Sequence, residues 1–278
     1  MILRTWLNTA TGQLEEAGVR EARLKAEWLL ADHLDIGRLH LHERRDEELD
    51  PTPLAPLLAR LCQHEPLQYV IGSTDFMGLS FTSDARALIP RPETELLVEW
   101  VMELAPPGGR ILDVGTGTGC IAIALARLRP DLDITAVDRS AAALALAREN
   151  AHALKVNIRL LESDLLAAVA GESFDLIVSN PPYIARDEML ELEPQIRSFE
   201  PETALLGGEN GAELMARLVP QAFTALRASG RLVLEIGENQ TKDVSELLAD
   251  AGFGEIAVRP DLAGKPRMAH GLKTWPTE

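Results

Sequence analysis

Hydrophobic and polar residues have one spacing pattern in the first quarter of the chain and a different one in the rest. AGVREARLKAEWLLADHL (residues 17–34) places apolar residues at helical spacing with charged residues between them. A further helix is expected to start at Thr52 and Pro53 and to run through LAPLLARLC. The pattern predicts a small helical domain over residues 1–61, compatible equally with simple packing and with partner binding.

Residues 62–95 have a mixed pattern. PLQYVIG (66–72) is short, aromatic and β-branched before a glycine, which predicts a strand that ends in a turn. FMGLSFTSDARALIPRPETE (76–95) alternates polar and apolar residues and is then interrupted by prolines. We interpret 62–95 as a hairpin-like connection to a second domain over residues 96–278.

In the second domain, continuous apolar runs alternate with helical patterns. Strands are expected at 110–115, 133–138, 157–163, 174–180 and 230–237, and helices at 120–128, 140–154, 210–228 and 240–251. Residues 255–261 and 267–273 can add two strands as a closing antiparallel pair. Strands without alternation, separated by helices, predict an α/β fold whose largely parallel sheet is covered on both faces.

Composition narrows the function classes. The 278 residues include 27 basic and 43 acidic side chains, so the formal net charge is −16, which weighs against a nucleic-acid substrate without excluding one. Cys62 and Cys120 lie far apart, so neither a disulfide framework nor a zinc site is expected, and a reducing cytoplasm is the expected compartment. Neither a signal peptide nor a membrane-spanning run is expected.

A glycine loop, DVGTGTG (113–119), follows the first strand of the second domain. The carboxyl end of this strand is where an open α/β sheet binds its ligand. Gly115, Gly117 and Gly119 allow a tight turn and a close backbone approach, and the following helix offers N–H groups to an anionic group. The spacing is GxGxG, so neither a dinucleotide fingerprint nor a phosphate loop is indicated.

Two aspartates end the next two strands. Asp138 lies 23 residues after Gly115 (138 − 115), near the offset at which a carboxylate binds ribose hydroxyls. Together with the glycine loop, it indicates S-adenosylmethionine as the ligand. Asp164 would lie near the adenine in that arrangement, although a plain turn aspartate fits its spacing nearly as well.

The fourth strand stops abruptly at Asn180, Pro181, Pro182 and Tyr183. The Asn180 side-chain oxygen and the Pro181 carbonyl can accept the two hydrogens of a planar NH₂ group, and Tyr183 offers a face for stacking. Prolines lack an N–H, so nearby carbonyls stay available to a ligand. NPPY therefore predicts methyl transfer to a planar nitrogen, which could belong to glutamine, adenine or cytosine.

Several stretches in order resemble the PrmC/HemK family, the glutamine methyltransferases of bacterial peptide chain release factors. They are PLQYVIG (66–72), ALIPRPETELLV (87–98), ILDVGTGTGCIAIALA (111–126), FDLIVSNPPYI (174–184), SFEPETALLGGENGAEL (198–214), LVLEIGENQ (232–240) and DLAGKPR (261–267). The resemblance covers nearly everything after residue 66, whereas the first 60 residues are similar only in being helical. IPRPETE (89–95) resembles the release-factor branch more than the sister family that methylates a ribosomal-protein glutamine.

The resemblance implies a Rossmann-like, seven-stranded methyltransferase domain behind an N-terminal helical domain, acting on a release factor. We expect the helical domain to dock the substrate and the protein to be a monomer. It implies that the donor contacts Gly115, Thr116, Gly117, Thr118, Gly119, Asp138 and Asn180. It also implies that the glutamine of the substrate's Gly-Gly-Gln loop is held by Asn180, Pro181, Pro182 and Tyr183. Leu165 departs from the family, which often has tryptophan after the third-strand aspartate.

Other functions remain open at this stage. A methyltransferase for a ribosomal-protein glutamine or for an exocyclic amine of RNA or DNA would use similar motifs, and a donor-binding module could regulate a partner without catalysis. Arg91, Glu93 and Glu95 fit structural pairing as well as a substrate role. Phe199, Glu200 and Pro201 fit either a pocket wall or simple packing.

Overall fold

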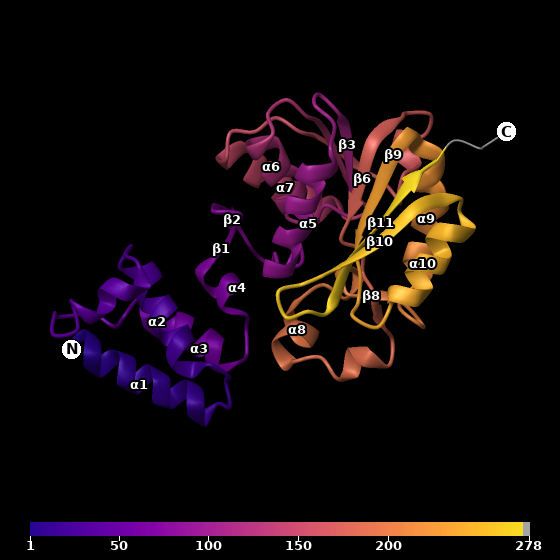
Figure 1. Cartoon of the computed structure of the whole chain (residues 1–278). Coiled ribbons are helices and arrows are strands. Elements are labelled where there is room, and N and C mark those ends of the chain that lie inside the picture. Colours follow the sequence, from indigo (N-terminus) through magenta and orange to yellow (C-terminus); the bar gives the residue numbers. More distant parts are fainter. Residues whose placement is uncertain (275–278) are drawn as a thin grey trace. The chain divides into compact units, whose positions relative to one another are not determined.

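The computed structural model describes residues 1–274, which divide into two compact units. The first unit consists of Met1–Ser73 together with Glu193–Phe199. The second consists of Thr74–Leu192 and the chain from Glu200 onward. Figure 1 shows the elements of both, coloured along the sequence. Within the described residues, no helix is both long and apolar enough to cross a membrane.

The first unit is helical, as the apolar spacing predicts. Its helices are α1 (Leu3–Glu16), α2 (Ala22–His33), η1 (Arg38–His42), α3 (Leu54–Cys62), α4 (Leu67–Ile71) and α8 (Pro194–Phe199). Leucines from α1, α2 and α3 form its buried core, among them Leu14, Leu29 and Leu61. The distant segment that carries α8 joins this unit through polar contacts, including a hydrogen bond of 3.1 Å from Lys25 Nζ to Gln195 Oε1.

The predicted strand over 66–72 is wrong, because these residues form helix α4. Pro66 precedes the first turn with an extended ψ of 137°, and Gly72 ends the helix in the left-handed conformation at φ 81°. A proline before the first turn and a glycine after the last are helix-boundary signals. Here they outweigh the β-branched pair Val70 and Ile71. Arg60 fastens the short helix by donating to the Tyr69 carbonyl at 3.0 Å.

A seven-stranded sheet forms the centre of the second unit, and it confirms the predicted α/β fold. The strands are β3 (Arg110–Val114), β4 (Asp133–Asp138), β5 (Arg159–Glu162), β6 (Phe174–Ser179), β9 (Leu226–Glu235), β10 (Phe253–Pro260) and β11 (Pro266–Lys273). Their order across the sheet is β10-β11-β9-β6-β3-β4-β5. The pairs from β9 through β5 are parallel, whereas β11 is antiparallel to both β9 and β10.

Helices cover both faces of this sheet, which explains why its strands are apolar without alternation. One face packs against α5 (Pro92–Leu104), α6 (Cys120–Leu128) and α7 (Ala141–Ala153), and the other against α9 (Glu213–Ala225) and α10 (Thr241–Asp250). These two groups of helices lie on opposite sides of the strands in Figure 1. The two buried clusters meet the sheet with residues such as Ile111 on one face and Leu112 on the other.

Short elements complete the second unit. Strands β1 (Ser73–Phe76) and β2 (Leu79–Thr82) form a two-stranded sheet, and β7 (Ile184–Ala185) pairs in parallel with β8 (Leu206–Gly208). The 3-10 helices are η2 (Ala167–Val169), η3 (Glu188–Leu190) and η4 (Glu202–Ala204). The β7–β8 pair brings the chain after β6 close to the segment that precedes α9.

Candidate active site

The glycine loop and the NPPY segment follow neighbouring strands at the point where the strand order reverses. From β3 the chain moves outward to β4 and β5, and then returns to the other side of β3 with β6. Val114 and Ser179 are register partners at the ends of β3 and β6, and Ser179 Oγ donates to the Val114 carbonyl at 2.6 Å. Gly115 and Asn180 are the next residues of their strands. Such a switch point is where open α/β sheets bind ligands.

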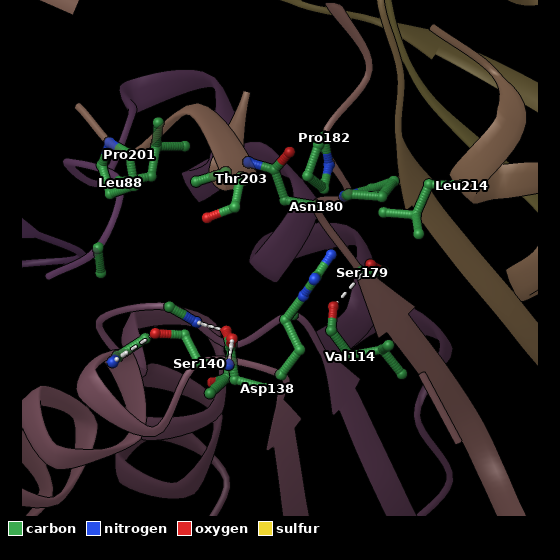
Figure 2. A pocket seen from close by; sticks show the side chains of 18 of the residues that line it. Leu88, Val114, Asp138, Ser140, Ser179, Asn180, Pro182, Pro201, Thr203 and Leu214 are labelled. Atoms are coloured by element: carbon green, nitrogen blue, oxygen red, sulfur yellow. Dashed lines mark hydrogen bonds between the residues drawn. The ribbon is translucent and has the colours of Figure 1, made fainter. Parts of the chain in front are cut away.

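A cavity of about 830 Å³ lies at this edge of the sheet. Figure 2 shows Asp138 and Ser140 on one side and Asn180 and Thr203 on the other. The wall comes from the glycine loop, the ends of β4, β5 and β6, the segment before α5 and the segment around β8. The volume is within the range of pockets that hold ligands of drug or cofactor size.

The glycine loop is anchored to β4 through its own backbone N–H groups. The N–H groups of Gly115 and Thr116 both donate to the Val137 carbonyl, at 2.8 and 3.0 Å. Gly119 has a φ of 83°, and a Cβ there would lie 2.8 Å from Ile123 Cδ1, so glycine is required at the start of α6. Four residues of the loop, Gly115 to Thr118, line the cavity, whereas Gly119 is not part of its wall among the described residues. Thr116 and Thr118 are almost fully buried.

Asp113 lies buried directly beneath this loop. Its Oδ2 accepts a hydrogen bond of 2.6 Å from Thr116 Oγ1, while Oδ1 has no hydrogen-bond partner among the described residues. Burial raises the pKa of the Asp113 carboxyl to about 7. A buried carboxyl oxygen without such a partner is a potential acceptor for a polar group or water. The sequence reading did not assign Asp113 a role.

Asp138 ends β4 with both carboxylate oxygens engaged by backbone N–H groups. Oδ2 accepts from Gly117 at 2.9 Å, and Oδ1 accepts from Ser140 at 2.8 Å. Both bonds orient the carboxylate, and the bond from Gly117 ties β4 to the glycine loop. Figure 2 shows Asp138 next to Ser140. Each carboxylate oxygen has two lone-pair directions, so Asp138 retains acceptor capacity toward the cavity.

Asp164 and Leu165 lie at the same edge, beyond β5. Asp164 Oδ2 accepts a hydrogen bond of 2.6 Å from Arg217 Nη2 on α9, and both side chains are largely exposed. Leu165 is buried, lines the cavity and has a φ of 52°, a conformation that is uncommon for a branched side chain. An aliphatic wall therefore takes the position at which the family often has an aromatic ring.

Asn180 lies at the cavity, and its amide group is held by Thr94, which lines the same cavity. Its Nδ2 donates to Thr94 Oγ1 on α5 at 3.1 Å, and Thr94 Oγ1 donates to Glu235 Oε2 at the end of β9 at 2.7 Å. Burial raises the pKa of the Glu235 carboxyl to about 7. One hydrogen of Nδ2 is used by Thr94, so the NH₂ group is turned toward Thr94 and the amide oxygen can accept from another group.

The next three residues do not all face the cavity. Pro181 and Pro182 line it, whereas Tyr183 is absent from its wall among the described residues and packs against the α9–α10 side of the sheet. Burial, with a smaller contribution from Glu235, raises the pKa of the Tyr183 phenol to about 12. The Tyr183 carbonyl accepts a hydrogen bond of 3.0 Å from Gln240 Nε2. The structure thus brings Asn180, Pro181 and Pro182 to the cavity and places Tyr183 behind them.

Gly207 of β8 shows how closely two segments pass beside the prolines. A Cβ at Gly207 would lie 2.7 Å from the Pro182 carbonyl oxygen and 2.3 Å from that of Gly211. No side chain other than hydrogen fits there. The glycine pair of LLGGENG therefore has a packing reason, and β8 can pass directly over the NPPY segment.

Two buried side chains connect segments around the cavity by hydrogen bonds, and the sequence did not predict this role for them. Glu200 is 6% exposed, and its carboxylate accepts from Arg91 Nη2 and from the Ile89 N–H, so it joins the segment before α5 to the one before β8. Asn150 on α7 is 1% exposed; its Nδ2 donates to the Thr118 carbonyl at 3.0 Å. Both link segments far apart in the chain, which local patterns do not reveal.

The fold and the two motifs at the switch point define a methyltransferase-type α/β domain. Residues 92–194 match the family model described as "Methyltransferase small domain" and residues 5–72 the one described as "PrmC N-terminal domain". Among solved structures, a methyltransferase from Pyrococcus furiosus has a TM-score of 0.57 at 19% identity and covers 81% of this chain and 100% of its own. The hMettl16 catalytic domain has a TM-score of 0.61 at 18% identity, covering 83% of this chain and 93% of its own. Likeness at this level shows the fold alone.

Curated relatives identify the family. Proteins named "Release factor glutamine methyltransferase" are 41% identical in Koribacter versatilis, over 98% of this chain and 99% of theirs, and 39% identical in Geobacter sulfurreducens, over 97% and 96%. The same name belongs to a relative in Cereibacter sphaeroides, 42% identical over 94% and 95%. The chain belongs to the release factor glutamine methyltransferase family, as the sequence motifs predict.

Proposed function

We propose that this protein transfers a methyl group from S-adenosylmethionine to the side-chain amide nitrogen of the glutamine in the Gly-Gly-Gln motif of a peptide chain release factor. The observation that carries the proposal is the orientation of the Asn180 carboxamide at the cavity. Its NH₂ group donates to Thr94, so its oxygen can accept a hydrogen bond from a substrate. Full-length relatives at about 40% identity carry the corresponding name, which supports the substrate.

The residues on the donor side fit S-adenosylmethionine. Asp138, pre-oriented by two backbone N–H groups, can accept hydrogen bonds from the two hydroxyls of a ribose. The N–H groups in the first turn of α6 have no partners within their helix and can bind the donor's carboxylate. Leu165 and the cavity side of Asp164 are available to the adenine. When bound, this cofactor supplies a methyl group on a positively charged sulfur.

On the acceptor side, Asn180 Oδ1 and the Pro181 carbonyl are proposed to accept the two hydrogens of the glutamine amide. An amide nitrogen is a weak nucleophile because its lone pair is shared with its carbonyl. Two acceptors in a partly buried site shift electron density toward that nitrogen and hold it in line with the methyl group. Pro182 keeps the wall free of competing N–H donors.

Proton removal does not require a strong base at the acceptor. The Tyr183 phenol, with a pKa of about 12, stays protonated at physiological pH and lies outside the cavity wall. Once the nitrogen carries the methyl group, it becomes far more acidic than the neutral amide. The proton can then pass to water by way of the hydrogen bond to the Asn180 oxygen.

The helical region over residues 1–61 is proposed to dock the release factor. It matches a family model of its own, and its core is separate from that of the sheet unit. The proposal includes a monomeric enzyme that works in the cytoplasm, where its substrate is found, and that takes no direct nucleic-acid substrate. The net charge of −16 favours a protein over a polyanion as the substrate.

The test uses labelled methyl donor and a purified bacterial release factor. We expect one methyl group on the release factor and none after Gln→Ala substitution in its Gly-Gly-Gln loop. Asn180→Ala should lower turnover by about 100-fold or more, since one of the two acceptors is lost. Methyl transfer that survives the Gln→Ala change would refute the substrate assignment.

Parallel reactions with a ribosomal protein fraction and with protein-free RNA and DNA test the other acceptors. Label in ribosomal protein alone would assign the chain to the sister activity. Label in nucleic acid would assign an exocyclic-amine methyltransferase. No transfer together with intact donor binding, unaffected by Asn180→Ala, would indicate a regulatory binding module.

A further inference from the structure

Asn180, Thr94 and Glu235 form a chain of hydrogen bonds that begins at the cavity wall, which Asn180 and Thr94 both line, and ends at the buried Glu235. Asn180 Nδ2 donates to Thr94 Oγ1 at 3.1 Å, and Thr94 Oγ1 donates to Glu235 Oε2 at 2.7 Å. Thr94 and Glu235 are each 2% exposed. The three residues come from the end of β6, the first turn of α5 and the end of β9, so the chain joins three elements at one point.

The donor and acceptor types determine the direction of this chain. An ionised carboxylate has no hydrogen to give, so the Thr94 hydroxyl must donate to Glu235. Only lone pairs then remain on Thr94 Oγ1, and the group of Asn180 that can meet them is NH₂. The carboxamide is thereby held with its oxygen pointing away from Thr94. The hydrogen-bond types alone give this orientation, although the oxygen and the NH₂ group have nearly the same shape.

We propose that Thr94 and Glu235 are positioning residues that hold the Asn180 carboxamide in the flip state whose oxygen receives the substrate amide. This inference rests on the proposed function and deepens it. The opposite flip state would present two hydrogens to the two hydrogens of the incoming glutamine, and the contact would be repulsive. The chain therefore decides whether Asn180 is an acceptor or a donor.

Protonation of Glu235 removes this constraint. A neutral carboxyl group can donate to Thr94 Oγ1, which frees the threonine hydrogen to donate to the Asn180 oxygen and favours the opposite flip. The titratable groups that face Glu235 are Arg91 and Glu93 before and in α5, the Cys120 thiol at the start of α6, Arg267 on β11, and the Tyr183 phenol. Burial is the largest influence on Glu235 and raises its pKa to about 7, within the range in which the enzyme would work.

Thr94 provides the decisive experiment. Thr94→Val keeps the shape and removes the hydroxyl, and we expect kcat for release-factor methylation to fall about 10- to 100-fold, the equivalent of one hydrogen bond that must hold a polar group in place. Donor affinity should stay within about twofold. Thr94→Ser restores the hydroxyl and should recover most of kcat. Thr224→Val is the matched control, since Thr224 on α9 is exposed and its hydroxyl donates to the Pro220 carbonyl of its own helix.

Glu235 adds a pH readout that a merely structural role would not change. The unaltered enzyme should lose kcat as the pH falls below about 7, because Glu235 becomes protonated. Glu235→Gln retains an oxygen that can accept from Thr94 and has no proton to gain, so this acid limb should flatten. If Glu235→Gln is too inactive to profile, the Thr94 series decides.

The two proposals fail in different ways. Normal kcat in Thr94→Val, or an unchanged acid limb in an active Glu235→Gln enzyme, would overturn the positioning role and leave the proposed function intact. Absence of methyl transfer to the release factor by the unaltered enzyme would instead refute the proposed function. Thermal unfolding and donor binding measured on each variant show whether a low kcat comes from a misfolded protein.

Discussion

At the scale of single residues, the site depends on polar side chains whose own partners are backbone groups or other buried side chains. Asp138 is oriented by the N–H groups of Gly117 and Ser140, and Asn180 by the hydroxyl of Thr94. Pre-oriented groups lose little conformational entropy when a ligand binds, so each remaining lone pair contributes more of its hydrogen-bond energy. This makes the site sensitive to single substitutions that leave the fold intact.

Asp138→Ala should weaken donor binding without unfolding the protein. Hydrogen bonds to charged groups contribute about 1.5–3 kcal/mol, so the dissociation constant of S-adenosylmethionine should rise about 10- to 100-fold by calorimetry. The circular dichroism spectrum should be unchanged. Asp250→Ala, at the exposed end of α10, is the control. Unaltered affinity in Asp138→Ala would remove this carboxylate from the ribose.

Glu235 should also make stability depend on pH. Its folded-state pKa of about 7 exceeds the ordinary 4.5, so between these values the folded protein binds more protons than the unfolded one. The free energy of unfolding therefore falls as the pH rises from about 4.5 to about 7. Glu235→Gln removes this contribution. The change in the free energy of unfolding caused by Glu235→Gln should therefore be more favourable at pH 8 than at pH 5. The difference should be up to about 3 kcal/mol, since one pKa unit corresponds to about 1.4 kcal/mol.

Urea denaturation at the two pH values measures this difference. Glu246→Gln serves as the control because its side chain is largely exposed on α10. Asp113, with a pKa also raised to about 7, contributes in the same direction in every variant and cancels from the comparison. Equal effects of Glu235→Gln at pH 5 and pH 8 would mean that burial does not raise this pKa.

At the scale of elements, the site is assembled by bonds between segments that are distant in sequence. Asn150 on α7 is the clearest case, because it accepts from the Thr82 N–H at 2.8 Å and donates to the carbonyls of Thr82 and Thr118. One side chain thus joins the end of β2 to the glycine loop. It replaces the backbone partners that an irregular loop cannot supply for itself.

Replacing Asn150 by leucine should destabilise the protein and weaken donor binding together. Leucine fills a similar volume but removes the partner of the buried Thr118 carbonyl and of the part-buried N–H and carbonyl of Thr82, a loss of about 2–5 kcal/mol in the free energy of unfolding. Asn157→Leu, at an exposed position after α7, should cost little. A stable Asn150→Leu protein with normal donor affinity would show that the glycine loop needs no support from α7.

The regular elements could be predicted from the sequence far better than the connections between them. Apolar runs and glycine signals predicted every strand of the large sheet to within a few residues. The signal is clearest in the central parallel strands, such as β3 and β6, which are buried on both faces. The segment 66–72 was predicted as a strand because of its β-branched pair, Val70 and Ile71. It forms a helix because its boundary residues, Pro66 and Gly72, outweigh that pair. Contacts such as Thr94 with Glu235, 141 residues apart, depend on how elements meet and leave no local pattern.

At the scale of the whole molecule, two compact units each have a hydrophobic core of their own. The helical core contains residues from α1 to α4, and the clusters on the two faces of the sheet draw on residues after the first unit. All residues that line the large cavity belong to the second unit. Donor binding and the stability of the helical unit therefore depend on different sets of contacts.

This separation predicts how the donor changes thermal unfolding. A ligand that binds only the folded second unit adds about 2.7 kcal/mol at a concentration 100 times its dissociation constant. For a unit of about 200 residues, that raises the melting temperature by roughly 5–10 °C. Calorimetry should show two transitions, of which the one with the larger enthalpy shifts with S-adenosylmethionine, while the smaller one, from the helical unit, stays in place. Asp138→Ala should reduce the shift. A single transition that moves as a whole would instead mean that the two units unfold together, and that donor binding stabilises the helical unit as well.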